Sequence, residues 1–212
     1  VINMDSMFYN CPNLTSLDLG ENFDTSKVTD MGRMFEGCSS LTGLNVSSFD
    51  TSNVTSMIYM FNNCSSLTEL NVNSFNTSNV TNMNRMFQYC TGLTSLNLGN
   101  DFYVSNVTDM ERMFWDCKAL KSITGSIKLD ENNAVQSINS MFQGCAELES
   151  VSFETLENGA QLDSLSSMED MFNGCVALKS VDLGNWSLPN ATNFINMFYG
   201  CSSLEDADLS WK

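Results

Sequence analysis

Eight cysteines are the residues of this 212-residue chain whose spacing most suggests chemistry. They follow one another at intervals of 26 to 30 residues, as Cys11, Cys38, Cys64, Cys90, Cys117, Cys145, Cys175 and Cys201. No two of them form a C-x-x-C pair and the chain has no histidine, which argues against a zinc site. Because buried free cysteine behaves as a small apolar residue, we predict a structural ladder of reduced, inward thiols. Disulfides between neighbouring segments remain the alternative, because stacked strands lie about 4.8 Å apart and bridged Cα atoms about 4.4–6.8 Å apart.

A pair of carboxylates is the other arrangement that could support catalysis. Asp182 and Asp208 occupy the same position in neighbouring segments, so stacking could bring them to the roughly 5 Å separation of retaining glycosidases. Carboxylate oxygens also bind calcium, and a weak calcium site near these residues is a second reading. We interpret the pair as a solvated acidic edge and expect no catalytic residue, no metal and no cofactor. Without histidine, neither Ser-His-Asp nor Cys-His catalysis is available.

The elements that must position these residues are repeats of about 27 residues. Residues 28–53, VTDMGRMFEGCSSLTGLNVSSFDTSN, recur with few changes as residues 54–79, and all 14 methionines fall at two positions of this register. A fixed period of this size predicts one supersecondary unit per repeat, stacked so that neighbours bury a shared core. We therefore predict a single solenoid domain over residues 1–212, with eight turns, called rungs below, as a fragment of a longer array.

Each rung is expected to contain two short strands and a helical turn. Apolar and polar residues alternate after each cysteine, as in residues 17–19, which predicts one strand of a parallel sheet. The Val-Thr-x-Met segment, such as residues 28–31, predicts a shorter second strand. The Met-x-x-Met-Phe-x-x-Cys pattern of residues 31–38 has spacings of three and four, which place its apolar side chains on one face of a helical turn. The predicted fold class is an α/β-type, leucine-rich-repeat-like solenoid.

The pattern V-T-x-M, followed by M-F-x-x-C-x-x-L-T-x-L, resembles the BspA-like leucine-rich repeats of bacterial surface proteins. It is most similar to the methionine-rich variant of Mycoplasma-type lipoproteins, and the resemblance covers essentially the whole chain. It implies a leucine-rich-repeat-like solenoid on a secreted or cell-surface protein, often engaged in adhesion or in binding host proteins. We therefore expect an extracellular or cell-surface location.

The charge of the chain argues against two classes of partner. A formal net charge of −16 opposes binding to nucleic-acid phosphate or to an anionic membrane surface. No apolar run approaches the roughly 18 residues of a membrane span, so we expect no direct membrane insertion in this segment. The predicted partner is a host or matrix protein, with a glycan as the alternative.

Arginine and large aromatic residues gather at one part of the register, around the second methionine and the phenylalanine. This group, called the arginine–aromatic column below, contains Arg33, Tyr59, Arg85, Tyr89, Arg112 and Trp115. Stacking places Tyr59 between Arg33 and Arg85, where cation–π contacts contribute about 0.5–1 kcal/mol at an exposed site. Arg, Tyr and Trp are enriched at binding hot spots, and three of only nine basic residues lie here. We predict a partner-binding surface; the alternative is that these side chains only cover the turns.

The function predicted from these observations is a non-enzymatic cell-surface module for protein binding or adhesion. The alternatives are a carbohydrate-active enzyme that uses Asp182 and Asp208, a glycan-binding domain, or a structural stalk. The chain also opens on the apolar residues Val1 and Ile2 without a polar cap, so we expect flanking repeats, a cap or a second copy over this end.

Overall fold

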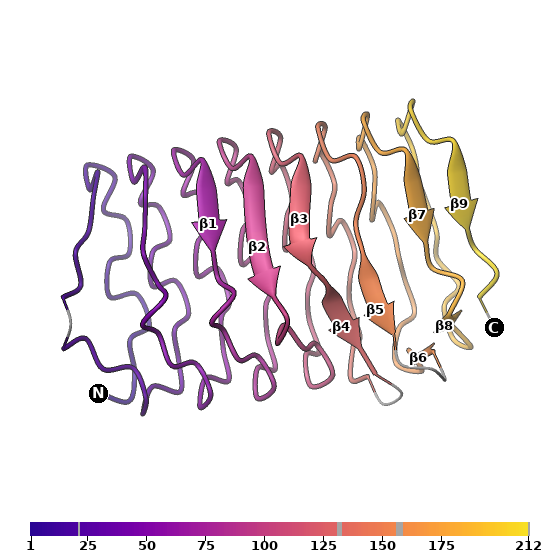
Figure 1. The fold of residues 1–212 in the computed structure, drawn as a ribbon. Coiled ribbons are helices and arrows are strands. Elements are labelled where there is room, and N and C mark those ends of the chain that lie inside the picture. Colours follow the sequence, from indigo (N-terminus) through magenta and orange to yellow (C-terminus); the bar gives the residue numbers. More distant parts are fainter. Residues whose placement is uncertain (21, 131–132, 156–158, 212) are drawn as a thin grey trace.

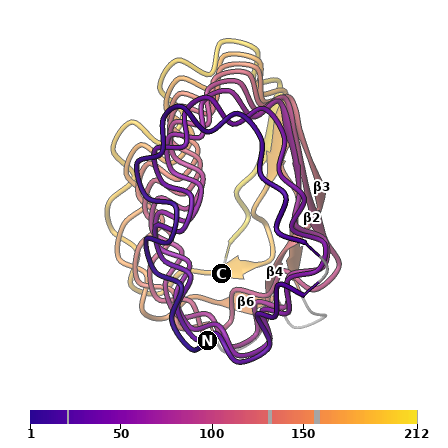
Figure 2. The same cartoon turned by 90° about the vertical axis from the view of Figure 1, so that its left-hand side faces the viewer.

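The chain is a β-solenoid in which flattened rungs stack along one axis and the termini lie at opposite ends (Figure 1). The computed structural model describes residues 1–20, 22–130, 133–155 and 159–211. Seen along the axis, most of the labelled strands lie on one side of an elongated cross-section, one further labelled strand lies at its lower edge, and irregular chain forms the side opposite the sheet (Figure 2). The predicted solenoid is therefore confirmed.

Short parallel strands form the sheet side. They are β1 (Glu69–Asn71), β2 (Ser95–Gly99), β3 (Ser122–Gly125), β4 (Ile127–Leu129), β5 (Phe153–Thr155), β6 (Ala160–Gln161), β7 (Ser180–Asp182), β8 (Trp186–Ser187) and β9 (Asp206–Asp208). They pair in the orders β1-β2-β3, β4-β5, β6-β8 and β7-β9, and every pair is parallel. Each strand pairs with a segment one rung away, as Leu70 does with Leu96, so their side chains stack in register inside the coil.

The second strand of each rung is reduced to single bridged residues. Parallel bridges connect one residue of the Val-Thr-x-Met segment with its counterpart in the next rung, in the series Asn3, Asp30, Ser56, Asn82, Asp109 and Ser137, and again between Ser167 and Asn193. The predicted second strand therefore lies where it was expected, but it consists of a single bridged residue in each rung.

Among the described residues the solenoid contains no helix, so the predicted α/β class and the helical turn of each rung are wrong. Every second N–H group of residues 31–37 donates to the next rung, as Arg33 does to the carbonyl of Ile58 at 2.8 Å. The N–H groups between them close tight turns, as Met34 does on the carbonyl of Met31 at 3.3 Å. The backbone φ is +51° at Arg33 and positive again four residues later, which a right-handed helix does not allow. The spacing of three and four residues therefore reflects a run of turns.

The detail of eight rungs that each contain a sheet strand is also not supported. Among the described residues, hydrogen-bonded strands begin only at Glu69, and residues 15–19 and 42–46 form no strand. The cysteine spacing widens to 28 and 30 residues where β4, β5 and β6 are added. Fewer rungs contain a sheet strand than the eight that the cysteine count predicts.

The core consists of columns of identical side chains. Phe35, Phe61 and Phe87 stack with ring centroids 5.5–5.6 Å apart and planes within 7° of parallel. The same stack continues through every rung from Phe8 to Phe198. Methionines from neighbouring rungs fill the adjoining column and are fully buried except near the ends. Each ring covers the faces of its neighbours, so a rung buries its apolar surface only when another rung lies on it.

The cysteine thiols lie inward beside this stack. From Cys38 onward, each Sγ donates to the phenylalanine carbonyl of the preceding rung at 3.1–3.2 Å, as Cys64 does to Phe35. All eight cysteines are free, and only Cys11 and Cys201, at the two ends, are partly exposed. Burial raises the pKa of the seven thiols from Cys38 to Cys201, to about 12 for Cys90, so they are protonated donors at neutral pH.

Alkylation tests this arrangement. In the native protein without reductant, we expect fast labelling of Cys11 and Cys201 and protection of the six buried thiols, because only the thiolate of an accessible cysteine reacts. Denaturation without reductant should then allow all eight to react, as counted by intact mass. Labelling of four or fewer in the denatured chain would show that disulfides join the rungs.

Replacement of one buried thiol tests its hydrogen bond. We expect Cys64→Ser to lower the free energy of unfolding by about 1–3 kcal/mol, because the shorter hydroxyl loses good geometry to the Phe35 carbonyl and remains buried. Urea denaturation measures the change, with Cys11→Ser at the partly exposed end as the control. An equal effect of both substitutions would contradict a specific role for the buried bond.

Candidate functional site

The arginine–aromatic column lies on the run of turns, on the outside of the solenoid. Arg33, Tyr59, Arg85 and Arg112 all occupy the first left-handed position of their rung, with φ between 51° and 56°. A non-glycine residue costs about 1–2 kcal/mol in this region. Ser6 and Asn196 share the conformation, so the strain belongs to the turn and does not by itself mark a function.

Tyr59 is enclosed by two arginines, as its place in the register predicted. The guanidinium carbons of Arg33 and Arg85 lie 5.6 and 5.4 Å from the centre of the ring, and Nη1 of Arg85 donates to the tyrosine hydroxyl. The two arginines therefore cover the ring, and Arg85 also occupies its hydroxyl. Tyr59 serves to hold two guanidinium groups at a fixed separation, and its ring is not free to stack on a partner.

The second half of the column is built around Trp115. The guanidinium of Arg112 lies 5.0 Å from the centre of the indole, and the ring of Tyr89 lies 5.3 Å away at 38°. Glu111 connects the two halves, because it pairs with Arg112 at 2.9 Å and with Arg85 at 3.8 Å. All six residues predicted for the column thus belong to one continuous cluster, which stays partly exposed.

Sequence reasoning missed the acidic residues of this cluster. Glu111 comes directly before Arg112 and pairs with it. Oε2 of Glu36 lies 3.6 Å from Nε of Arg33, and Oδ1 of Asp5 lies 3.8 Å from Nη1 of the same arginine. These carboxylates offset the charge of the three arginines, so the surface is not a basic patch. The only signal in the sequence was their proximity to arginine, because the same register positions elsewhere hold unrelated residues such as Asn62.

Glu36 is the titratable group that this environment changes most. Its side chain is 18% exposed. Burial raises the pKa of this carboxyl, the guanidinium of Arg33 opposes that effect and Asp5 adds to it. Its Oε2 makes no hydrogen bond, and neither do the buried atoms Oδ1 of Asn84 and Nε of Arg112. The cluster therefore contains polar groups whose bonding capacity is not filled.

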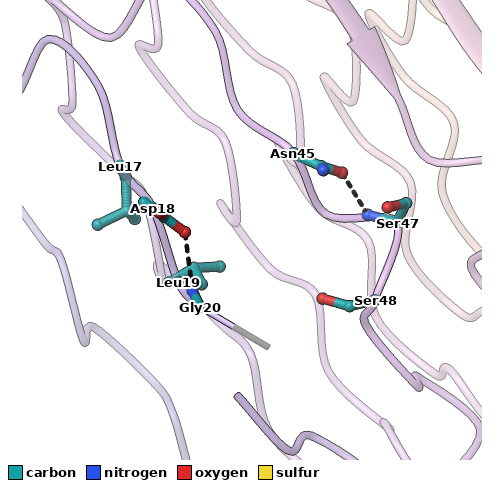
Figure 3. A pocket seen from close by; sticks show the side chains of 7 residues that line it. All are labelled: Leu17, Asp18, Leu19, Gly20, Asn45, Ser47 and Ser48. Atoms are coloured by element: carbon teal, nitrogen blue, oxygen red, sulfur yellow. Dashed lines mark hydrogen bonds between the residues drawn. The ribbon is translucent and has the colours of Figure 1, made fainter. Parts of the chain in front are cut away.

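The sheet side offers open hollows of mixed polar and apolar lining instead. One of about 450 Å³ is lined by residues that include Thr42, Asn71 and Asn97. A second of about 420 Å³ lies between residues 17–20 and the segment that begins at Asn45, and Figure 3 shows its lining. Hydroxyl and amide side chains line both hollows together with leucines, and no nucleophile with an activating base lines either of them.

Two of the polar side chains that line the second hollow, Asp18 and Asn45, already have partners within their own turns. The carboxylate of Asp18 accepts the N–H of Gly20 at 2.9 Å, and Oδ1 of Asn45 accepts the N–H of Ser47 at 3.0 Å (Figure 3). Such bonds form Asx turns that reverse the chain after each extended segment. This polar column is thus explained by its structural role.

The same role accounts for Asp182 and Asp208. Their Cα atoms are paired in register, and both side chains are exposed. Asp182 accepts the N–H of Gly184 at 3.0 Å, and Asp208 accepts the hydroxyl and N–H of Ser210 at 2.6 and 2.9 Å. These bonds lower the pKa of Asp208, whereas a general acid needs a raised one. Over the described ranges, no three His, Cys, Asp or Glu side chains converge to hold a metal ion.

Comparison with known proteins places the repeats in a family. A family model described as "Mycoplasma protein of unknown function, DUF285" matches residues 2–127, 45–154 and 121–212, which together span nearly the whole chain. No curated protein matches the chain. In the part of the chain that the structure describes, no helix is long and apolar enough to span a membrane.

Solved structures with some similarity are bacterial repeat proteins. A leucine-rich cell surface protein from Faecalibacterium prausnitzii is 19% identical, with 96% of this chain and 75% of that chain covered and a TM-score of 0.36. A leucine-rich repeat protein from Eubacterium ventriosum is 17% identical, with 88% and 54% covered and a TM-score of 0.35. At these values the similarity says nothing about the function of this chain.

Neutralising Glu36 tests the electrostatics of the cluster. Because its pKa is raised on folding, the folded protein binds this proton more tightly, and stability falls as the pH rises through that pKa. We expect Glu36→Gln to be more stable than the parent at neutral pH and to lose this advantage near pH 4, where the carboxyl is protonated (ordinary pKa about 4.3). Urea denaturation at several pH values measures the difference. Glu69→Gln, at an exposed position, is the control, and destabilisation of Glu36→Gln at neutral pH would show that the Arg33 pair outweighs burial.

Proposed function

The chain belongs to the family described as Mycoplasma protein of unknown function, DUF285, and from this premise we propose that it is a non-enzymatic cell-surface module for protein binding. The family agrees with the Mycoplasma-type repeats that its sequence resembles, and that resemblance supports a surface location. The partner is a host or matrix protein. It binds the outside of the turns, at the arginine–aromatic column.

The observation that supports this proposal is the preorganised cluster on the turns. Tyr59 holds Arg33 and Arg85, and Glu111 fixes Arg112 beside Trp115. Arginine loses much side-chain entropy when it is immobilised, so side chains already held in place bind at a lower entropic cost. Trp, Tyr and Arg are also the residues that contribute most to protein interfaces.

The charges of the cluster favour a protein over a polyanion as partner. Glu36, Glu111 and Asp5 lie among the arginines, and the whole chain has a net charge of −16. A polyanion would meet these carboxylates as well as the guanidinium groups. A protein surface can pair acidic side chains with the arginine edges and place apolar side chains against Trp115, so its mixed chemistry matches the cluster better.

Glycan binding on the sheet side is the second candidate. The hollow beside Asn71 and Asn97 presents amides and hydroxyls at the spacing of the rungs, which suits a ligand rich in hydroxyl groups. It lacks an aromatic platform, and the side chains of its Asn column form Asx turns. Carbohydrate cleavage is less well supported, since hydrogen bonds lower the pKa of Asp208 and both Asp182 and Asp208 accept hydrogen bonds within their own turns.

Binding measurements separate these functions. Against purified matrix proteins immobilised on a sensor surface, we expect Arg112→Ala and Trp115→Ala each to weaken binding by more than about 1 kcal/mol, roughly fivefold or more, because they remove exposed anchors. Tyr59→Ala should weaken binding less directly, by freeing Arg33 and Arg85. Circular dichroism and urea denaturation check that folding is retained.

Matched substitutions on the sheet side are the control. Asn71→Ser and Asn97→Ser change the other face and keep a side chain that can accept the turn N–H. If these abolish binding while Arg112→Ala and Trp115→Ala do not, the sheet is the binding face. Binding to a glycan panel instead of any protein would support the second candidate, and no binding to either would leave a structural stalk.

A further inference from the structure

One glycine interrupts the outer face of the sheet side without a reason in the backbone. Gly43 occupies the register position that holds Glu69, Ser95 and Ser122 in the next three rungs. Its φ lies outside the left-handed region, and a Cβ added to it would meet no atom within 4 Å. Glycine is therefore required here neither by a turn nor by a close approach of two rungs. Its effect is on the surface, because it leaves open the space that a side chain would fill.

The rung that contains Gly43 and the next rung also diverge at this point. On the turn side, the ring centroids of Phe35 and Phe61 lie 5.6 Å apart. Those of Phe49 and Phe75, which follow the sheet segments of the same two rungs, lie 6.3 Å apart. No described backbone hydrogen bond joins β1 to the preceding rung, and β1 pairs with β2 alone. The other edge of β1 therefore has backbone groups without a backbone partner.

The sheet-side hollow of about 450 Å³ lies where these two features meet, and it is lined by unpartnered polar groups. Gly43 and β1 both line it. The carboxylate of Glu69 and the hydroxyl of Ser95, which also line it, make no hydrogen bond or ion pair within the described chain. Asn71 and Asn97 accept the N–H groups of their own turns through Oδ1, at 3.1 and 3.0 Å, and their Nδ2 groups remain available as donors. Acceptors and donors are thus gathered around one hollow.

Apolar side chains line the same hollow. Leu44 is partly exposed there, whereas its counterparts Leu70 and Leu96 are 3% and 1% exposed. Apolar lining with a few polar groups, in a hollow of this volume, is typical of sites for small ligands. A sugar matches this lining, because its hydroxyls donate to a carboxylate and accept from amides. Its C–H groups can at the same time cover the leucine.

We propose that this hollow binds one neutral sugar unit of a glycan. Glu69 accepts hydrogen bonds from its hydroxyls, and the amides of Asn71 and Asn97 donate to its oxygens. The sugar is neutral because the unpaired carboxylate and the net charge of −16 both oppose sialylated or sulfated units. This narrows the glycan-binding candidate to one hollow, which Gly43 opens. The hollow lies on the side opposite the arginine–aromatic column (Figure 2), so it is a further site, independent of the protein binding proposed there.

Filling the hollow tests the proposal. On an array of neutral oligosaccharides with their sialylated and sulfated counterparts, we expect the parent chain to bind neutral ones. Titration calorimetry with the neutral oligosaccharide bound most strongly then compares variants. Gly43→Val adds a side chain where nothing obstructs it and favours an extended chain, so its urea midpoint should equal or exceed that of the parent. Its affinity should fall by about tenfold or more, and that of Glu69→Gln by about tenfold, because a charged acceptor is lost.

The matched control is Ser150→Val, which adds the same side chain at the same register position, on a rung that does not line the hollow. It should bind the oligosaccharide as the parent does, and so should Trp115→Ala, whose effect is confined to protein binding on the other side. A parent that binds no neutral oligosaccharide, or that binds the sialylated or sulfated forms more tightly, overturns the proposal. So does unchanged affinity in Gly43→Val or Glu69→Gln, or an equal loss in either control.

Discussion

Hydrogen bonding between successive rungs is the interaction on which the rest of this structure depends. An isolated rung satisfies few of its backbone groups, since alternate N–H groups of each turn segment have their acceptors in the next rung. A buried N–H or carbonyl without a partner costs about 1–3 kcal/mol, so a rung that loses its neighbour loses several such bonds at once. Side chains extend the same pattern. The hydroxyl of Thr51 donates to the carbonyl of Asn76 and accepts its N–H, at 2.9 and 2.8 Å.

This constraint explains why the repeat specifies unusual residues at fixed places. Cysteine can fill a buried apolar site and still donate to the carbonyl above it, which alanine and valine cannot do. Glycine is required where rungs approach most closely. Gly125 has a φ of +81°, and a Cβ there would lie 2.3 Å from the carbonyl oxygen of Gly99. The composition of the repeat thus follows from contacts between rungs more than from the preferences of one segment.

The sequence correctly predicted the features that depend on the repeat register. It did not predict the backbone conformation within each rung, which depends on local φ and ψ angles. Equal spacing of cysteine, methionine and phenylalanine was enough to predict stacked core columns and a parallel sheet. The helical turn was wrong because a run of tight turns brings every third or fourth residue to one side, as a helix does. The distinguishing feature is the positive φ at residues such as Arg33 and Tyr59, and neither residue type favours that region. The available hint was the glycine, asparagine or aspartate at the second left-handed position of most rungs, as in Gly37 and Asn63.

The candidate site was predicted in part for the same reason. Stacking alone placed Tyr59 between two arginines, whereas Glu36 and Glu111 were missed because they break the pattern of their columns. That irregularity has a physical basis. Side chains at the left-handed positions point away from the core, and the backbone bonds that flank them fix the rung whatever side chain is present. Ser6, Arg85 and Asp170 accordingly share one conformation with φ of 56–60°. Substitutions at this column can change what the surface binds at little cost to the ladder, which separates recognition from folding in a protein whose rungs are otherwise nearly identical.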